Sequence, residues 1–146
     1  MYLLKDFCDC MAQVGLLEDN IRIAKLCSTM LQYAGHQVVI FEHSRACLDA
    51  LLPSQQAALH RGPSPIDVLI LDLHLPDIPG IDVLSLLRAH PRTSSLPLIF
   101  CTAATPGEIS RALSMAPEAC FIEKPFTYQE LVSAITRALH PIKVSS

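Results

Sequence analysis

The sequence predicts an α/β protein in which five parallel strands form a sheet in the order 2-1-3-4-5 and five helices cover both faces. Short apolar runs alternate with segments of helical periodicity along the chain, which is the pattern of a sheet built from strand–helix units. The apolar runs are unbroken, as is typical of strands buried on both faces. With right-handed crossovers, the flavodoxin-like strand order is the natural choice for such a chain.

Five apolar runs bounded by turn residues predict the strands. They are Val14–Leu17, Gln37–Phe41, Val68–Leu71, Pro97–Cys101 with Thr102 at its end, and Ala119–Ile122. Runs of this length suit strands rather than helices.

Apolar residues spaced three and four apart between these runs predict five helices. The first helix follows Asn20. The other four run from Ser44 to about Leu52, from about Ile81 to Ala89, from about Glu108 to Met115, and from Thr127 to His140. Asn20 and Ser44 are the expected N-caps and Gly35 the expected C′ residue, while Thr127 and Glu130 have capping-box spacing. The apolar face of the third helix is expected to contain Val83, Leu84, Leu86 and Leu87.

A single domain over residues 13–140 accounts for these elements, and a chain of 146 residues can bury a substantial core. Residues 1–12 are assigned to an N-terminal extension and residues 141–146 to a short tail. Residues 54–65 are expected to extend the second helix and then form a loop, which makes them an unusually long insert.

The composition excludes several classes of protein. With 51% hydrophobic and 17% charged residues, the chain is expected to fold rather than to stay disordered. Its net charge of −3, without a cluster of Lys and Arg, does not favour nucleic acid or an anionic membrane as a partner. No apolar segment reaches membrane-spanning length, and the acidic N-terminus does not fit a signal peptide. We therefore expect the protein in the cytosol.

The six cysteines do not suggest a disulfide framework. Four lie singly in expected helices or strands, as small buried hydrophobes do: Cys27, Cys47, Cys101 and Cys120. Cys8 and Cys10 form a lone C-x-C pair with no second pair, which favours reduced thiols over a zinc site.

Asp72 stands directly after the apolar run Val68–Leu71. Taken alone, such an Asp most simply caps the next loop. However, Glu18 and Asp19 follow the first strand, which neighbours the third strand in the predicted order, so the three carboxylates converge at one edge of the sheet. They cannot all stay ionised without a cation. Oxygen ligands without Cys or His favour Mg²⁺.

Two further side chains reach the same edge of the sheet. Thr102 ends the fourth strand and Lys124 ends the fifth. Each fits an ordinary strand-end or surface role when taken singly, but their shared position with the acids favours a common site. Acids, a hydroxyl, an ammonium group and a metal suit phosphoryl transfer, in which an aspartate attacks phosphorus to form an acyl phosphate.

Four motifs of the chain resemble those of receiver domains of two-component response regulators, the CheY-like family. They are Leu-Leu-Glu-Asp-Asn (16–20), Leu-Ile-Leu-Asp-Leu-His-Leu-Pro-Asp-Ile-Pro-Gly (69–80), Ile-Phe-Cys-Thr-Ala (99–103) and Phe-Ile-Glu-Lys-Pro-Phe (121–126). The resemblance covers about residues 13–140. It implies that Asp72 accepts a phosphoryl group from a histidine kinase or a phosphotransfer protein in a phosphorelay.

The same resemblance implies a Mg²⁺ site. Its ligands would be Asp19, Asp72 and the backbone carbonyl of His74, with Glu18 acting through water. Thr102 and Lys124 would contact the phosphoryl group, and the peptide bond between Lys124 and the following proline would be cis.

The resemblance also implies a switch, in which the Thr102 hydroxyl moves inward on phosphorylation and the aromatic Phe121 turns into the space it leaves. This would change the surface of the helix at 108–115, the fifth strand and the last helix. Because Phe121 lacks a hydroxyl, the switch would work by packing alone; a static core aromatic is the alternative. His74 and Ala104 hold positions that tune the lifetime of the phosphate, and the small Ala104 would leave water less hindered.

This interpretation makes the chain a signalling domain rather than an enzyme, with a downstream effector domain or protein as its second partner. A homodimer through the switch surface stays open, as does the choice between a stand-alone receiver and a piece of a larger regulator or hybrid kinase. One alternative is a pseudo-receiver that acts by binding alone, against which the complete set of charged residues argues. Another is a magnesium phosphohydrolase of the haloacid dehalogenase type, which requires Asp-x-Asp at the position where this chain has Asp72-Leu73-His74.

Overall fold

The structure, a computed structural model, describes residues 11–52 and 64–141. Its helices and strands are β1 Gln13–Leu17, α2 Ile21–Tyr33, β2 Gln37–Phe41, α3 Ser44–Leu51, β3 Val68–Leu71, α4 Gly80–Ala89, β4 Leu98–Thr102, α5 Pro106–Met115, β5 Cys120–Glu123 and α6 Tyr128–Leu139. The strands form one sheet in the order β2-β1-β3-β4-β5, with every neighbouring pair parallel. The predicted fold and strand order are confirmed.

Some expectations fall outside the described residues. They concern the N-terminal extension up to residue 10 with its Cys8 and Cys10, the helical extension expected from residue 54, and the tail from residue 142. Residues 64 and 65, at the end of the expected insert, lie in no helix or strand. None of the described helices is long and apolar enough to cross a membrane.

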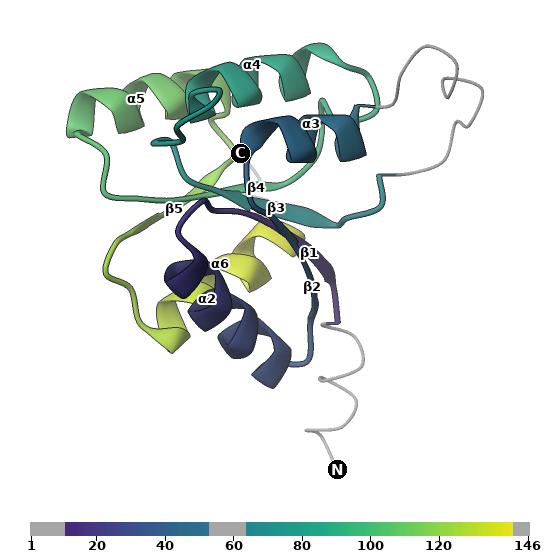
Figure 1. The fold of residues 1–146 in the computed structure, drawn as a ribbon, viewed down its shortest axis with the longest axis vertical. Coiled ribbons are helices and arrows are strands. Elements are labelled where there is room, and N and C mark those ends of the chain that lie inside the picture. Colours follow the sequence, from purple (N-terminus) through teal and green to yellow (C-terminus); the bar gives the residue numbers. More distant parts are fainter. Residues whose placement is uncertain (1–10, 53–63, 142–146) are drawn as a thin grey trace, which may run out of the picture.

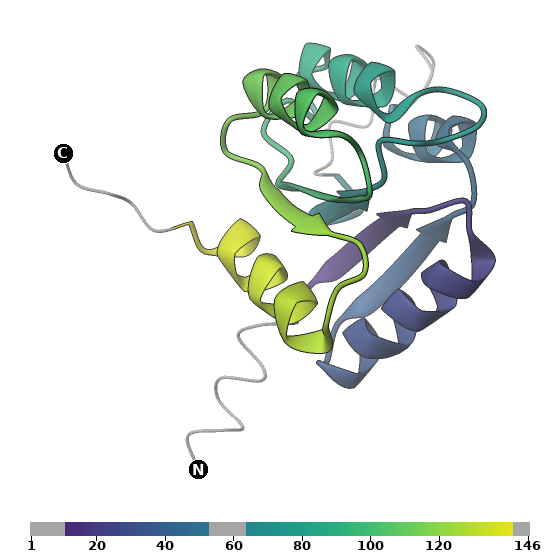
Figure 2. The same cartoon turned by 90° about the vertical axis from the view of Figure 1, so that its left-hand side faces the viewer.

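The helices lie in two layers, one on each face of the sheet. Figures 1 and 2 show α3, α4 and α5 on one face and α2 and α6 on the other. Each layer closes a hydrophobic core, and β3 contributes side chains to both cores. All four residues of β3 are buried, and each apolar side chain of this size contributes about 1.5–3 kcal/mol on burial. The central strand is therefore a firm base for the residue that follows it, Asp72.

The start of α3 differs from the prediction. His43 rather than Ser44 is the N-cap, because its Nδ1 accepts a hydrogen bond from the N–H of Ala46 at 3.1 Å. The Ser44 hydroxyl instead donates to the carbonyl of Ile78 at 2.7 Å. Asp77, from the loop after β3, accepts hydrogen bonds from the first two N–H groups of the helix at 3.2 and 3.0 Å. Burial raises the pKa of Asp77, but these hydrogen bonds outweigh it and bring the pKa below its ordinary value.

Three smaller expectations are also corrected. Helix α5 begins at Pro106 rather than near Glu108, because Thr105 caps it and forms a capping box with Glu108. Strand β5 starts and ends one residue later than expected, because its pairing with β4 continues to Glu123. Leu86 is 47% exposed, so the buried face of α4 is narrower than expected. That face contains Gly80, Val83, Leu84 and Leu87.

The other expected helix caps and the expected cis bond are confirmed. Asn20 caps α2 by accepting hydrogen bonds from two backbone N–H groups, and Gly35 follows this helix with a φ of 97°, a conformation that favours glycine. Thr127 and Glu130 form the expected capping box at the start of α6. The bond between Lys124 and the following proline is cis.

The described cysteines are free thiols. Cys27, Cys47 and Cys101 are buried as expected, whereas Cys120 is only half-buried. Burial raises the pKa of Cys27 to about 11 and those of Cys47 and Cys101 to about 12. These three thiols are therefore protonated and unreactive at neutral pH.

We expect His36 to make the stability of the fold depend on pH. This residue is 6% exposed, its Nδ1 accepts a hydrogen bond from the Ala12 N–H at 3.1 Å, and burial lowers its pKa. A folded-state pKa below the unfolded value means that this stability is complete above about pH 6.5 and is lost as the pH falls below it. Urea unfolding should therefore show a loss of up to about 1.4 kcal/mol per pH unit below that value. In His36→Asn, which keeps an acceptor but does not titrate, the loss should be smaller; equal pH dependence of the two proteins would contradict the assignment.

Candidate functional site

Three carboxylates meet at the carboxyl edge of the sheet. Glu18 and Asp19 follow β1, and Asp72 follows β3. The two strands are paired in register from Val14 opposite Val68 to Leu17 opposite Leu71, so the residues that come next emerge side by side. One oxygen of each carboxylate lies within 4.8 Å of the others. Glu18 and Asp72 are buried, while Asp19 is exposed, which leaves one side of the cluster open to solvent.

Lys124, which directly follows the outer strand β5, reaches into this cluster along the same carboxyl edge. Its Nζ lies 2.8 Å from Oε1 of Glu18 and 2.8 Å from Oδ2 of Asp72. The Lys124 side chain is 16% exposed. Burial lowers the pKa of Lys124, but the hydrogen bonds to the two carboxylates outweigh it and raise the pKa. The ammonium group is thus a fixed positive charge held between two acids.

Asp72 is held in its ionised form. Burial raises its pKa, but the hydrogen bonds from Lys124, from the His74 N–H and from the Thr102 hydroxyl outweigh burial and lower the pKa. The His74 N–H donates to Oδ1 of Asp72 at 3.0 Å, so its two oxygens have different partners. Thr102 is fully buried, and its Oγ1 also accepts a hydrogen bond from the Ala104 N–H at 3.1 Å. The expected hydroxyl of β4 therefore lies beside the expected carboxylate of β3.

Glu18 differs from Asp72 in that its pKa is raised rather than lowered. Burial raises the pKa of Glu18 to about 7, although Lys124 opposes this shift and the Asp72 charge adds to it. Three acids with one cationic partner form an oxygen-only donor set, which suits a hard divalent cation. The residues present thus fit the Mg²⁺ site expected from the sequence.

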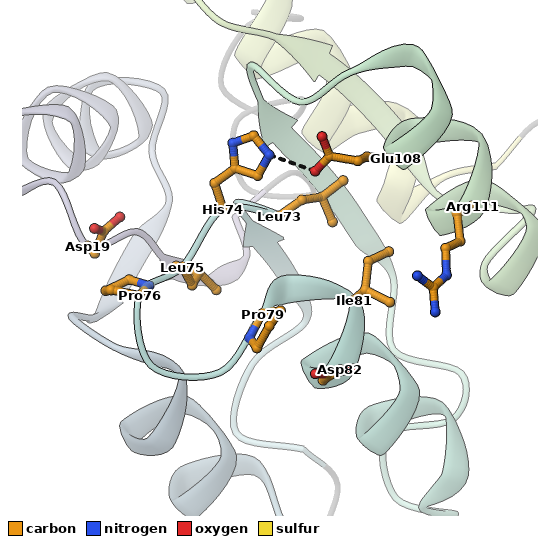
Figure 3. Close-up of a pocket in the computed structure, with 10 residues that line it drawn as sticks. All are labelled: Asp19, Leu73, His74, Leu75, Pro76, Pro79, Ile81, Asp82, Glu108 and Arg111. Atoms are coloured by element: carbon orange, nitrogen blue, oxygen red, sulfur yellow. Dashed lines mark hydrogen bonds and ion pairs between the residues drawn. The ribbon is translucent and has the colours of Figure 1, made fainter.

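A cavity of about 670 Å³ opens beside the acidic cluster. Figure 3 shows that Asp19 and His74 line it, together with Ile81 and Asp82 from α4 and Glu108 and Arg111 from α5. Across the cavity rim, His74 Nε2 and Glu108 Oε2 form a hydrogen bond of 2.6 Å. This bond and the capping-box bonds from Thr105 lower the pKa of Glu108.

Gly80 allows α4 to start close to the site. Its N–H donates to the carbonyl of Leu73 at 3.0 Å. A Cβ at this position would lie 2.5 Å from the carbonyl oxygen of Asp72 and 2.6 Å from the Cα of Leu73. Its φ is not positive, so the need for glycine here is one of space. Neither Gly80 nor Glu108 was expected at the site; the spacing Thr105-x-x-Glu108 could have revealed the capping box, but no sequence signal pairs Glu108 with His74.

Two residues expected to contribute lie outside the cluster of charges. Phe121, on β5, is half-buried, pairs in register with Phe100 and packs against the core on the side of α3, α4 and α5. It lines a separate cavity of about 420 Å³ with residues of α6. Ala104, in the loop after β4, is half-buried and packs against the same core. The structure thus brings together Glu18, Asp19, Asp72, Thr102 and Lys124, whereas Phe121, earlier on the strand that leads to Lys124, packs against the core instead.

The strand order and the acid–lysine site at the carboxyl edge define the class of CheY-like receivers. Residues 14–136 match the response regulator receiver domain family, and the chain belongs to this family. Among curated relatives, the transcriptional regulatory protein CreB of Escherichia coli K12 is 35% identical over 89% of this chain and 52% of its own length. CpxR of the same organism is 31% identical over 88% of this chain and 50% of its own length. The chain therefore spans about half the length of these relatives.

Solved structures support the same fold. The chemotaxis protein CheY4 of Vibrio cholerae matches with a TM-score of 0.72 and 26% identity over 88% of this chain and 99% of its own. The receiver domain of the sensor histidine kinase PA1611 of Pseudomonas aeruginosa, described with a magnesium ion in its active site cleft, has a TM-score of 0.72, 22% identity, and coverage of 88% of this chain and 97% of its own. At 22% identity, the second match supports the fold alone.

Proposed function

We propose that this domain accepts a phosphoryl group on Asp72 from a histidine kinase or a phosphotransfer protein. The observation that carries the proposal is Lys124 Nζ, which lies 2.8 Å from the carboxylates of both Glu18 and Asp72. An ammonium group fixed beside an ionised carboxylate can bind a phosphoryl oxygen while that carboxylate attacks phosphorus. A lysine with only a stabilising role would not need a third, exposed acid, Asp19, at the same point.

The covalent step transfers a phosphoryl group from a phosphorylated donor to Asp72. An oxygen of Asp72 attacks phosphorus and forms the new P–O bond, while the bond from phosphorus to the donor breaks and its electron pair leaves with the donor. Lys124 contacts one phosphoryl oxygen and the Thr102 hydroxyl donates to another. Asp19, Asp72 and the backbone carbonyl of His74 would hold Mg²⁺, with Glu18 acting through water. When bound, the ion supplies charge that neutralises the phosphoryl oxygens.

The proposed output is a change in the surface formed by α5, β5 and α6. When Thr102 is drawn toward the phosphoryl group, Phe121 packs into the space it leaves; this fits the burial of Thr102 beside Asp72 and the position of Phe121 on the neighbouring strand. An effector domain or protein, or a second copy of the chain, would bind this surface. CreB and CpxR are named transcriptional regulatory proteins, and we infer that an effector outside residues 13–140 receives the signal. The domain turns over only its own phosphoryl group.

Acetyl phosphate with Mg²⁺ tests the phosphoacceptor. Intact-mass spectrometry should show one added phosphoryl group on the wild type, and none on Asp72→Asn or after chelation of the metal. Wild type that stays unmodified would refute the proposal and favour a pseudo-receiver. Continued turnover of a phosphate ester would instead favour the phosphohydrolase alternative.

A further inference from the structure

A short bridge of side chains crosses the rim of the acidic site. It consists of His74, two residues after Asp72, and Glu108, in the first turn of α5; we call this pair the crossbar. The two side chains meet through the 2.6 Å hydrogen bond between His74 Nε2 and Glu108 Oε2. Figure 3 shows the two side chains pointing toward each other across the gap between the loop after β3 and α5.

Both ends of the crossbar are anchored. On one side, the His74 N–H donates to Oδ1 of Asp72 at 3.0 Å. On the other side, Oε1 of Glu108 accepts hydrogen bonds from the backbone N–H and the hydroxyl of Thr105 at 3.3 and 2.9 Å. The Glu108 side chain is thereby folded back along the loop that contains Ala104, and its second oxygen remains for His74. A pair with fixed ends loses less side-chain entropy than a free surface pair.

The position of the crossbar limits the paths to Asp72. Lys124 and Glu18 occupy the side of its Oδ2, and the cavity that Asp19, His74 and Glu108 line opens on the exposed, Asp19 side of the cluster; we infer that a small molecule reaches Asp72 from that side. Ala104 alone is too small to close this approach. Glu108, reaching back from α5, adds a carboxylate that the loop itself does not provide.

We propose that the His74–Glu108 crossbar restricts the access of small molecules to Asp72, and so slows both phosphorylation by small acyl phosphates and hydrolysis of the phosphoryl group. This inference rests on the proposed function of Asp72. In phosphorylation, the carboxylate leaves phosphorus as the Asp72 oxygen attacks. In hydrolysis, a water oxygen attacks phosphorus, the P–O bond to Asp72 breaks with its electron pair returning to the carboxylate, and the water proton passes to phosphate or solvent.

The leaving carboxylate and the attacking water both lie opposite the Asp72 oxygen, in line with the bond that forms or breaks. A barrier on that side therefore slows both reactions. Substitution of a residue that activated water would change the rate of hydrolysis only. Substitution of a residue that only stabilised the fold would lower the melting temperature and change neither rate.

His74→Ala and Glu108→Ala test the crossbar. With acetyl phosphate and Mg²⁺, both the rate of phosphorylation and the rate of phosphate loss after removal of the donor should rise about two- to fivefold, the bias that an exposed pair can impose. The double variant should match the single variants, because each already breaks the same bridge. Glu108→Gln keeps an acceptor oxygen for Thr105 and presents an amide N–H donor to His74, which the neutral imidazole can accept in its other tautomer, so it should restore most of the restriction.

Glu130→Ala is the matched control, because Glu130 closes an equivalent capping box with Thr127 and belongs to α6, on the opposite face of the sheet from α5. It should lose about the same stability as Glu108→Ala and leave both rates unchanged. Rates that stay at the wild-type value in His74→Ala and Glu108→Ala, that fall, or that change for hydrolysis alone would overturn the crossbar. If the wild type takes up no phosphoryl group at all, it is the proposed function that fails.

Discussion

Lys124→Met is expected to slow the phosphorylation of Asp72 by about 10²- to 10³-fold, the typical cost of removing one preorganised charge from a transition state. The substitution keeps the apolar stem and removes only the ammonium group that lies 2.8 Å from both Glu18 and Asp72. Without it the two buried acids face each other, and breaking a buried ion pair costs about 3–5 kcal/mol. Because Lys124 is not wholly buried, we expect about 3 kcal/mol, measured by urea unfolding without divalent cation.

Magnesium and pH distinguish this effect from simple loss of packing. Mg²⁺ should stabilise Lys124→Met more than the wild type, because the ion replaces the missing positive charge. Without its partner, Glu18 is best tolerated in the variant when it is protonated. A buried acid whose folded-state pKa is raised makes the fold less stable as the pH rises through that pKa. The loss of stability of Lys124→Met relative to the wild type should therefore grow from about pH 5 to 8. Lys25→Met, at an exposed position of α2, serves as control and should keep the wild-type rate. A deficit that neither Mg²⁺ nor pH changes would show that Lys124 acts only by packing.

The part of the site that could be predicted depends on short-range rules. Asp72 follows a run buried on both faces, and Glu18 and Asp19 follow the strand next to it. Since parallel strands end at one edge, knowledge of the strand order was enough to bring these carboxylates together. The same rule brought Thr102 and Lys124 to that edge, although it says nothing of the two 2.8 Å contacts that Lys124 makes.

The features that could not be predicted join segments far apart in the chain. Asp77 binds the start of α3 across 33 and 32 residues, and His74 binds Glu108 across 34. Local spacing carries no signal for such pairs, because it does not say how far one helix is shifted along the sheet relative to another. The boundary of α5 is a different case: Thr105, Pro106 and Glu108 contain the usual signals of a helix start, and the expected start near Glu108 did not make use of them.

Gly80→Ala is expected to destabilise the fold by about 3 kcal/mol, at the upper end of the usual cost of overpacking. The added Cβ would lie 2.5 Å from the Asp72 carbonyl oxygen and 2.6 Å from the Leu73 Cα. These are backbone atoms at the end of the central strand, so no side-chain rotation can relieve the contact and the loop after β3 must move. Because that loop contains Asp72 and the His74 N–H that orients it, phosphorylation by acetyl phosphate should slow as well. Urea unfolding and the phosphorylation rate measure the two effects.

Gly107→Ala provides the matched comparison, since Gly107 also lies in the first turn of a helix but a Cβ there would meet nothing within 4 Å. Alanine is the better helix former by up to about 1 kcal/mol, so this variant should be unchanged or slightly more stable. The same chemical change would then have opposite signs at two helix starts, and only the one that touches the Asp72 backbone would alter phosphorylation. Equal stabilities for the two variants would mean that α4 can move away from the loop freely. In that case the close approach at Gly80 would not be what holds the carboxylate of Asp72 in place.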